Sequence, residues 1–122
     1  MAVHRVLVIE DDPLFSQCIC IMLVRAGYDT LAVSDGLAAL DAIQGYQPHV
    51  IFLDMRLPIL DGWGFLQKYR DQPGVHKPII ASSAGNVDPA SLGNVVEFFG
   101  KPFRMQSFLN IVGTLCSPLA TS

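Results

Sequence analysis

Carboxylates follow two apolar segments of this chain at the positions where a strand would end. Residues 6–9 run directly into Glu10 and Asp11, and residues 50–53 run into Asp54. Unbroken apolar runs of this length are typical of strands that are buried on both faces in a parallel sheet. The carboxyl ends of such strands form the ligand crevice of the sheet. Asp54 is therefore a candidate for chemistry, although an Asp here could also serve only as a turn residue.

The chemistry of these side chains favours a hard metal ion and a phosphoryl group. Glu10, Asp11 and Asp54 in one crevice would repel one another and raise at least one pKa unless a cation lay among them. Mg²⁺ takes one or two carboxylates and leaves room for waters and phosphate oxygens. One lysine would complete the neutralisation, and Lys101 follows the last predicted strand, while Ser83 ends the one before it. A metal site, a carboxylate nucleophile, a cation and a hydroxyl are the parts that phosphoryl transfer needs.

The elements that would position these residues alternate along the chain. Strand patterns occupy 6–9, 28–33, 50–54, 78–83 and 95–99, and helical patterns occupy 13–26, 36–44, 63–70 and 105–116. Asp12 is expected to cap the first helix and Ser34 or Asp35 the second. Strand and helix alternate without a repeat or linker, which predicts one α/β domain over 1–122. Right-handed crossovers favour a flavodoxin-like, doubly wound parallel sheet of order 2-1-3-4-5 with helices on both faces.

Composition limits the class of protein. A chain of 122 residues can bury its own core, and 51% of its residues are apolar against 16% charged. Buried strands explain part of that excess, and an apolar patch for a partner could explain the rest. The net charge of −3 provides no basic field for nucleic acid, and the apolar run 18–24 is too short to cross a membrane. Three cysteines without metal-type spacing favour reduced thiols and a cytoplasmic protein.

The histidines are expected far from the carboxylates. His4, His49 and His76 each precede a predicted strand. The amino ends of parallel strands lie at the edge opposite their carboxyl ends, so we assign the histidines to the solvated opposite rim. We therefore expect neither a histidine metal site nor a histidine-based catalytic dyad at the acidic edge.

Taken together, these residues resemble the receiver domains of two-component response regulators, including the single-domain chemotaxis type. The resemblance covers residues 4–116. It rests on Glu10-Asp11, on Asp54 followed by Pro58 and Asp61-Gly62, on Ser83, and on Lys101-Pro102-Phe103. Each motif is weak by itself, but their order and their positions at strand ends are specific.

The resemblance implies a role for each residue at the acidic edge. Asp54 would accept a phosphoryl group from the phosphohistidine of a sensor histidine kinase or phosphotransfer protein. Asp11 and Asp54 would bind Mg²⁺ directly, Glu10 would bind it through water, and the backbone carbonyl of Arg56 would complete the shell. Lys101 would pair with the phosphoryl group.

A relay from the site to the surface is also implied. The bond from Lys101 to Pro102 would be cis. The phosphoryl group adds charge and acceptors, which would pull Ser83 and Lys101 inward. Phe98 could fill the space that Ser83 vacates and change the surface seen by a partner. Phe98 could equally be an ordinary core aromatic.

The chain departs from the family pattern in two places. The segment from Ser83 to Lys101 is shorter than usual, and Pro89 and Gly93 make it a poor helix. We therefore predict a short or irregular fourth helix and an unusual partner surface. Arg56 overhangs the predicted site, where its side chain could shield an acyl phosphate from water or hold an anion.

The implied function is a signalling switch that catalyses its own phosphorylation and dephosphorylation and is not otherwise an enzyme. No basic recognition helix is present, so we expect output through a downstream protein, with a homodimer as one option, and neither direct nucleic-acid binding nor membrane insertion. An FMN-binding electron carrier is disfavoured because Glu10 and Asp11 would repel its phosphate. A phosphatase with an Asp nucleophile would carry a second Asp where this chain has Arg56. A degenerate receiver that acts only as a docking module stays open.

Overall fold

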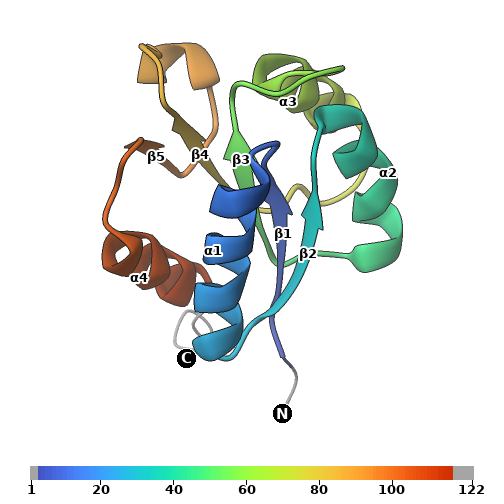
Figure 1. Ribbon diagram of the computed structural model, residues 1–122. Helices are drawn as coiled ribbons and strands as arrows, with labels where there is room; N and C mark the ends of the chain where they lie inside the picture. Colours follow the sequence, from blue (N-terminus) through green and yellow to red (C-terminus); the bar gives the residue numbers. More distant parts are fainter. Residues whose placement is uncertain (1–2, 117–122) are drawn as a thin grey trace.

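Short apolar strands and longer helices alternate along the chain, and the computed structural model, which describes residues 3–116, folds them into one layered domain. The strands are β1 (Arg5–Ile9), β2 (Asp29–Val33), β3 (Val50–Asp54), β4 (Ile79–Ser83) and β5 (Glu97–Gly100). The helices are α1 (Pro13–Arg25), α2 (Gly36–Tyr46), α3 (Gly62–Asp71) and α4 (Met105–Cys116), with a 3₁₀ turn η1 (Pro89–Leu92). All strand pairs are parallel in the order β2-β1-β3-β4-β5, which confirms the predicted topology (Figure 1).

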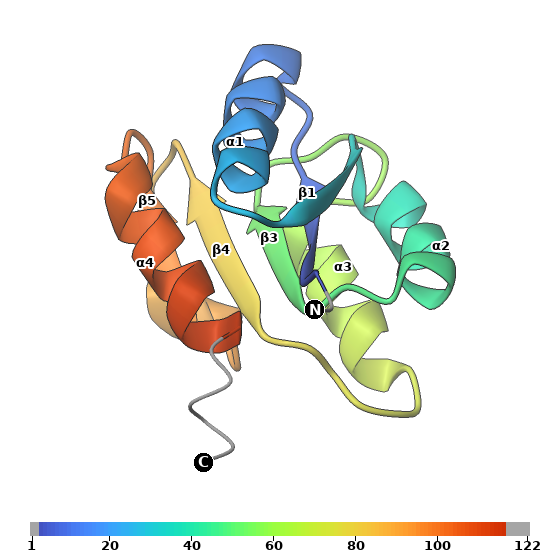
Figure 2. The same ribbon diagram turned by 90° about the horizontal axis from the view of Figure 1, so that it is seen from below.

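Helices cover both faces of the sheet, and this explains the unbroken apolar runs. Alternate residues of β1 and β3 point to opposite faces, so that Val8 and Phe52 pack with α1 and α4, while Ile9 and Leu53 pack with α2 and α3. Figure 2 shows the two helix layers from below. Every residue of β3 is buried. The central strands thus have no solvent-facing side, as their sequences predict.

Carboxylates cap the helices that follow the strands. The Asp12 side chain accepts a hydrogen bond from the backbone N–H of Leu14 at 3.1 Å, and Asp35 accepts one from Ala38 at 2.7 Å. The predicted end of α2 at residue 44 is wrong by two residues, because Gly45 stays helical and Gln47 takes the left-handed conformation at φ 53°. A glycine near a helix end costs only about 1 kcal/mol, so it does not by itself stop the helix.

The loop after β3 turns sharply enough to require glycine. The Asp61 side chain accepts a hydrogen bond from the N–H of Gly64 at 2.9 Å and so caps α3. A Cβ on Gly62 would lie 2.6 Å from the Cα of Met55. The Asp61-Gly62 pair therefore brings α3 back against the end of β3.

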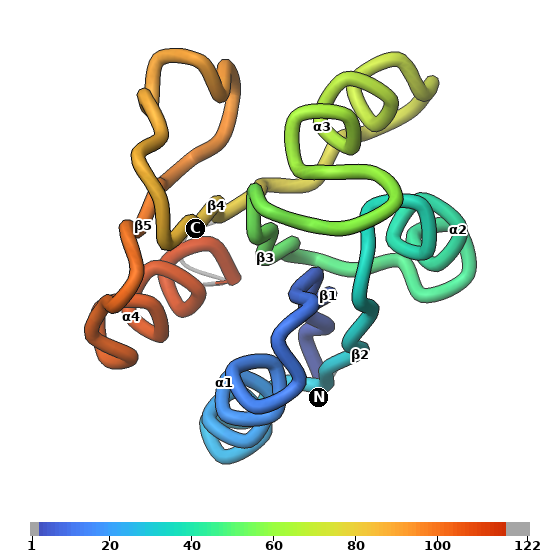
Figure 3. The backbone as a smooth tube through the Cα atoms, turned by 45° about the horizontal axis from the view of Figure 1, so that its top comes forward, coloured from blue at the N-terminus to red at the C-terminus, as the bar shows by residue number. Residues whose placement is uncertain are grey.

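The connection from β4 to β5 contains only the single 3₁₀ turn η1, which confirms the predicted irregular fourth helix (Figure 3). The Asp88 side chain caps it by accepting from the N–H of Ala90 at 3.0 Å, and Leu92 is buried beneath it. β5 begins at Glu97, two residues later than predicted. This thin cover leaves Val96 48% exposed beside the edge strand.

The last helix and the termini complete the description. In α4, Phe108, Val112 and Cys116 are buried, whereas Met105, Leu109 and Leu115 are half-buried. All cysteines of the described part are free. Among residues 3–116 no helix has the length and apolar character that a bilayer crossing needs. The predicted domain of 1–122 includes residues 1–2 and 117–122, which lie outside the described residues.

Candidate functional site

Three carboxylates lie at the carboxyl edge of the sheet, at or just after the ends of β1 and β3. Asp54 is the last residue of β3, and Glu10 follows β1, where its N–H donates to the carbonyl of Val33 at 3.0 Å. Asp11 is exposed, whereas Glu10 and Asp54 are 3% and 4% exposed. One carboxylate oxygen of each residue lies within 4.8 Å of the others. The predicted convergence of Glu10, Asp11 and Asp54 is therefore present.

Lys101 is the cation of this cluster. Its Nζ lies 2.6 Å from Glu10 Oε1 and 3.3 Å from Asp54 Oδ2, and these are the only ion pairs among residues 3–116. The same Nζ lies 4.2 Å from the ring centroid of Phe15 on α1, a cation–π contact. The bond from Lys101 to Pro102 is cis, as the family resemblance implies. The lysine is thus held from three sides.

Backbone N–H groups fix the buried carboxylates from the other side. Glu10 Oε2 accepts from the N–H of Asp12 at 3.1 Å, and Asp54 Oδ1 accepts from the N–H of Arg56 at 3.1 Å. Each carboxylate therefore has one oxygen on Lys101 and the other on a loop amide. Two fixed contacts per group set the orientation of both side chains before any ligand arrives.

The crowded carboxylates change the protonation of the site. Burial raises the pKa of Glu10 to about 7; the hydrogen bonds from Lys101 and Asp12 oppose this, and the charge of Asp54 adds to it. Burial lowers the pKa of Lys101, but the hydrogen bond to Glu10 and the charge of Asp54 outweigh it, so the net shift is upward. Burial and the neighbouring Asp54 thus favour a proton on Glu10, and a divalent cation could displace it.

The donor set fits Mg²⁺ on chemical grounds. The cluster offers oxygen ligands only, and no His or Cys belongs to it within the described residues. Hard divalent ions prefer such ligands, and Mg²⁺ keeps several waters or phosphate oxygens in its shell. The formal charge of three carboxylates and Lys101 leaves −2 for the ion to neutralise. The arrangement can hold one divalent cation with a phosphoryl group beside it.

Two consecutive serines end β4 beside Asp54. Ser82 is the register partner of Asp54, and Ser83 follows at 1% exposure with its Oγ accepting from the N–H of Gly85 at 3.3 Å. The Ser83 carbonyl accepts from the N–H of Lys101 at 2.8 Å, which ties the two predicted site residues together. The Ser82 hydroxyl is buried without a hydrogen-bond partner among the described residues. Sequence reasoning missed Ser82, although a serine inside a run of apolar strand residues is a usable signal.

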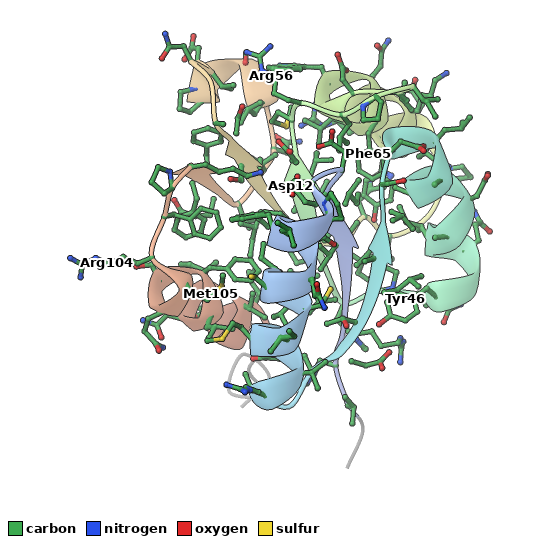
Figure 4. The ribbon with its side chains drawn as sticks, viewed as in Figure 1. Asp12, Tyr46, Arg56, Phe65, Arg104 and Met105 are labelled. Carbon is green, nitrogen blue, oxygen red and sulfur yellow. The ribbon has the colours of Figure 1, made fainter. Side chains whose placement is uncertain are left out.

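Arg56 follows β3, and its side chain lies at the upper end of the molecule (Figure 4). Its guanidinium carbon lies 5.4 Å from the ring centroid of Trp63, and Nη2 donates to the carbonyl of Asn86 at 3.4 Å. Trp63 Nε1 in turn donates to Ser91 Oγ at 3.4 Å. These contacts hold the guanidinium between α3 and the loop after β4, and its shielding role stays a prediction. Its anchor Trp63 was not foreseen, since a tryptophan in the first turn of a helix carries no special signal.

Phe98 lies on β5 opposite Ala81 and is half-buried. Its ring packs against the core cluster that also contains Leu92 of η1. A half-buried aromatic between the core and the thinly covered edge is compatible with either predicted role, the coupling residue or the plain core residue.

Fold and site together define the class: a flavodoxin-like α/β domain with a carboxylate cluster that could hold a cation at its switch point. Within this class the family model described as "Response regulator receiver domain" matches residues 6–112. The chain therefore belongs to the response regulator receiver family, whose general function is phosphorylation by a histidine kinase in two-component signalling.

The curated relatives are longer proteins. The DNA-binding response regulator MtrA of Mycolicibacterium smegmatis is 32% identical over 104 residues, which is 83% of this chain and 45% of MtrA. The DNA-binding dual master transcriptional regulator RpaA of Synechocystis is 32% identical over 116 residues, covering 91% of this chain and 48% of RpaA. This chain thus spans less than half the length of these relatives.

Solved receiver domains share the whole fold. The receiver domain of the sensor histidine kinase PA1611 from Pseudomonas aeruginosa, which has a magnesium ion coordinated in its active site cleft, superposes with a TM-score of 0.83 at 28% identity, covering 93% of this chain and 98% of that one. The Francisella response regulator 1452 receiver domain gives 0.84 at 30% identity, covering 92% and 95%.

Proposed function

We propose that Asp54 is the phosphoryl acceptor of this receiver domain. One Asp54 carboxylate oxygen attacks phosphorus, the new O–P bond forms, and the N–P bond of the donor phosphohistidine breaks. The leaving imidazole nitrogen keeps the electron pair of that bond and takes a proton from solvent. The observation that carries the proposal is the position of Asp54, buried at a strand end beside Glu10, Asp11 and Lys101.

The residues that would hold Mg²⁺ are Asp11 and Asp54 directly, Glu10 through water, and the backbone carbonyl of Arg56. The clustered carboxylates support this, as does the magnesium ion in the related PA1611 domain. Bound Mg²⁺ would neutralise charge on the transferring phosphoryl oxygens. Asp54 is already oriented by the Arg56 N–H, and Lys101 would move its Nζ from the carboxylates to the phosphoryl oxygens.

The switch would run through β4 and β5. The Ser83 hydroxyl, now only weakly held by the N–H of Gly85, would turn to the phosphoryl oxygens. Phe98 would then fill the space that Ser83 leaves, and the surface around η1 would change. Arg56 would cover the aspartyl phosphate and slow its hydrolysis, a role supported by its span between Trp63 and Asn86.

The expected partners are a sensor histidine kinase or phosphotransfer protein and a downstream protein that reads the β4–β5 surface. The chain would work in the cytoplasm, where its free thiols stay reduced. A homodimer through the same surface remains an option, and we propose no direct nucleic-acid contact by this domain. The domain would act as a signalling switch that catalyses only its own phosphorylation and dephosphorylation.

Intact-mass analysis after incubation with Mg²⁺ and acetyl phosphate tests this function. Wild type is expected to gain the mass of one phosphoryl group, and omission of Mg²⁺ or the substitution Asp54→Asn should abolish the gain. A gain that survives Asp54→Asn would move the acceptor elsewhere. No gain by the wild-type protein, also with a phosphorylated histidine donor, would favour the degenerate receiver that serves only as a docking module.

A further inference from the structure

A cavity lies at the edge of the sheet opposite the acidic site. It has a volume of about 450 Å³ and is bounded by the amino ends of β1, β3 and β4 and by the carboxyl ends of α2 and α3. Figure 4 shows Tyr46, the last residue of α2, at the lower end of the molecule and Arg56 at the upper end. Small-molecule sites in proteins occupy about 300–1,000 Å³, so the cavity is large enough for an organic ligand.

The wall of this cavity carries basic groups and no carboxylate. Arg5, His49, His76 and Lys77 line it, and neither Asp nor Glu does. A neighbouring cavity of about 330 Å³ shares His76 and Lys77, adds Arg70, and also has no acidic lining residue. The net charge of the protein is −3, so this local excess of bases runs against the overall charge.

The two permanent charges of the cavity have no ionic partner. Neither Arg5 nor Lys77 forms an ion pair among residues 3–116. Asp29 is the strand neighbour of Arg5, but its Oδ2 accepts from the Tyr46 hydroxyl at 2.7 Å and it makes no ion pair with the guanidinium. The Lys77 side chain is exposed and makes no hydrogen bond within the described part of the chain.

A capping role accounts for only part of this charge. Arg5 Nε donates to the carbonyls of Tyr46 and Gln47 at 2.9 Å each, at the carboxyl end of α2. A helix end carries about half a negative charge, so the ends of α2 and α3 offset about one of the two positive charges. Near the carboxyl end of α3, the formal charges of Arg70 and Asp71 offset each other. A net positive field therefore remains in the cavity.

The two histidines of the wall differ: His49 has a free donor, whereas His76 Nε2 already contacts the carbonyl of Gln72 at 2.9 Å. His49 Nδ1 accepts from the N–H of Arg5 at 2.9 Å, which leaves Nε2–H as the donor of its neutral ring. Burial lowers the pKa of His49, and the charges of Arg5, His4 and Lys77 add to the effect, as expected for a positive field. Tyr69 fixes the far wall, because its hydroxyl accepts from the Lys77 N–H at 2.8 Å and its ring stacks on Phe65 at 5.6 Å.

We propose that this cavity, lined by Arg5, His49, His76 and Lys77, binds a small organic oxyanion, a phosphate ester or a carboxylate of about the size of a nucleoside monophosphate. This goes beyond the phosphoryl-acceptor function and is independent of it. The site needs no divalent cation, because its own bases supply the charge that the ligand requires.

The test is an NMR titration of the ¹⁵N-labelled protein without Mg²⁺ or phosphodonor, with AMP and citrate as the anions and adenosine as the neutral control. AMP, citrate or both are expected to shift the amides of Gln47, His49 and Lys77 saturably, with a Kd of about 1 mM or below. Binding of one anion alone assigns the phosphate or the carboxylate class. The amides of Asp11 and Asp54 should not move.

Lys77→Gln should weaken binding about tenfold, because one charged donor is lost. Lys68→Gln on the exposed part of α3 is the matched control and should leave affinity unchanged. Arg5→Gln should weaken binding as well, and its circular dichroism spectrum and melting curve separate this from loss of the α2 cap. The proposal is overturned if neither anion gives saturable shifts, if adenosine shifts the same amides as strongly, or if Lys68→Gln weakens binding as much as Lys77→Gln.

Discussion

At the carboxyl edge of the sheet three carboxylates cluster and two of them pair with one lysine, whereas at the amino edge one arginine, one lysine and two histidines line a cavity that has no carboxylate. The same strands join the two edges: β1 begins at Arg5 and leads to Glu10, and β3 is preceded by His49 and ends at Asp54. Parallel strands bring residues that precede them to one edge and residues that follow them to the other. A parallel sheet therefore sorts charges by their position relative to each strand.

The two edges also differ in how tightly they are built. Around Asp54 the backbone is crowded, with Gly62 against Met55 and with Ile59 held at φ 68° although it is 80% exposed. Around the amino-edge cavity, a Cβ added to Gly45 or Gly74 would meet no heavy atom within 4 Å, and Val75 is 82% exposed. The same kind of substitution should therefore change the free energy of unfolding in opposite directions at the two edges.

The largest contrast between the two edges is expected when a glycine is replaced by alanine. Gly62→Ala places a methyl group against the Met55 backbone and should lower the free energy of unfolding by about 3 kcal/mol. Gly45→Ala, in the last turn of α2, meets open space and should raise it by about 0.5 kcal/mol through helix propensity. Urea unfolding of both variants measures the difference, and equal effects would contradict the contrast in packing.

The contributions of the two edges to stability should also change with pH in opposite directions. The pKa of Glu10 rises from 4.5 to about 7 on folding, so the folded protein holds an extra proton between these values. Without Mg²⁺, stability should therefore fall by about 1–3 kcal/mol as the pH rises from 4.5 to 7. Glu10→Gln should remove this fall. Mg²⁺ should stabilise the protein more at about pH 8 than at about pH 5.5, since at the higher pH it no longer competes with the proton.

At the amino edge the lowered pKa of His49 works the other way. The unfolded state binds the proton more readily, so this contribution is present above pH 6.5 and is lost as the pH falls. His49→Gln should make the fall of stability with rising pH steeper. Thermal unfolding over about pH 5–8 checks both signs, and a His49→Gln profile flatter than wild type would refute the assignment.

A smaller contrast concerns backbone strain. Ile59 is a β-branched residue with its backbone in the left-handed region. Ile59→Gly should raise the free energy of unfolding by about 0.5–1 kcal/mol, because the relief of strain exceeds the entropy that glycine adds to the unfolded state. Val75→Gly is the control at the amino edge, where φ is not positive, and should lower it by about 0.5–1 kcal/mol. Urea unfolding again gives the comparison, and destabilisation by Ile59→Gly would rule out strain at this loop.

The smallest expected effect concerns Arg56. Arg56→Ala should shorten the aspartyl-phosphate half-life about two- to fivefold, because an exposed cation contributes about 0.2–1 kcal/mol to such a contact. Lys68→Ala, an exposed lysine on α3, is the matched control. Loss of the phosphoryl mass over time, followed for both variants, measures it. Equal lifetimes of wild type and Arg56→Ala would discard the shielding role.

Sequence reasoning reached furthest where local and global preferences agree. The buried run of β3, the caps Asp12 and Asp35, and the weak helix between β4 and β5 were all predictable, since each depends on nearby residues. The end of α2 was not predictable, because it depends on a residue far away in the sequence. Arg5 of β1 donates to the carbonyls of Tyr46 and Gln47, where the helix ends. The alternation of residues along β4 did not single out Ser82 either, because only the strand register shows that it lies beside Asp54.

The order of strands and helices, the family, and the edge at which each charged residue lies all follow from the sequence alone, because hydrophobic period and position relative to a strand are local properties. Which of these charges meet is a matter of tertiary packing. Lys101 reaches Glu10 across 91 positions of the chain, and Arg56 contacts Trp63 on α3 and Asn86 in the loop after β4. The bases Arg5 and Lys77 share a cavity for the same reason: side-chain distances across the sheet depend on packing that no local pattern encodes.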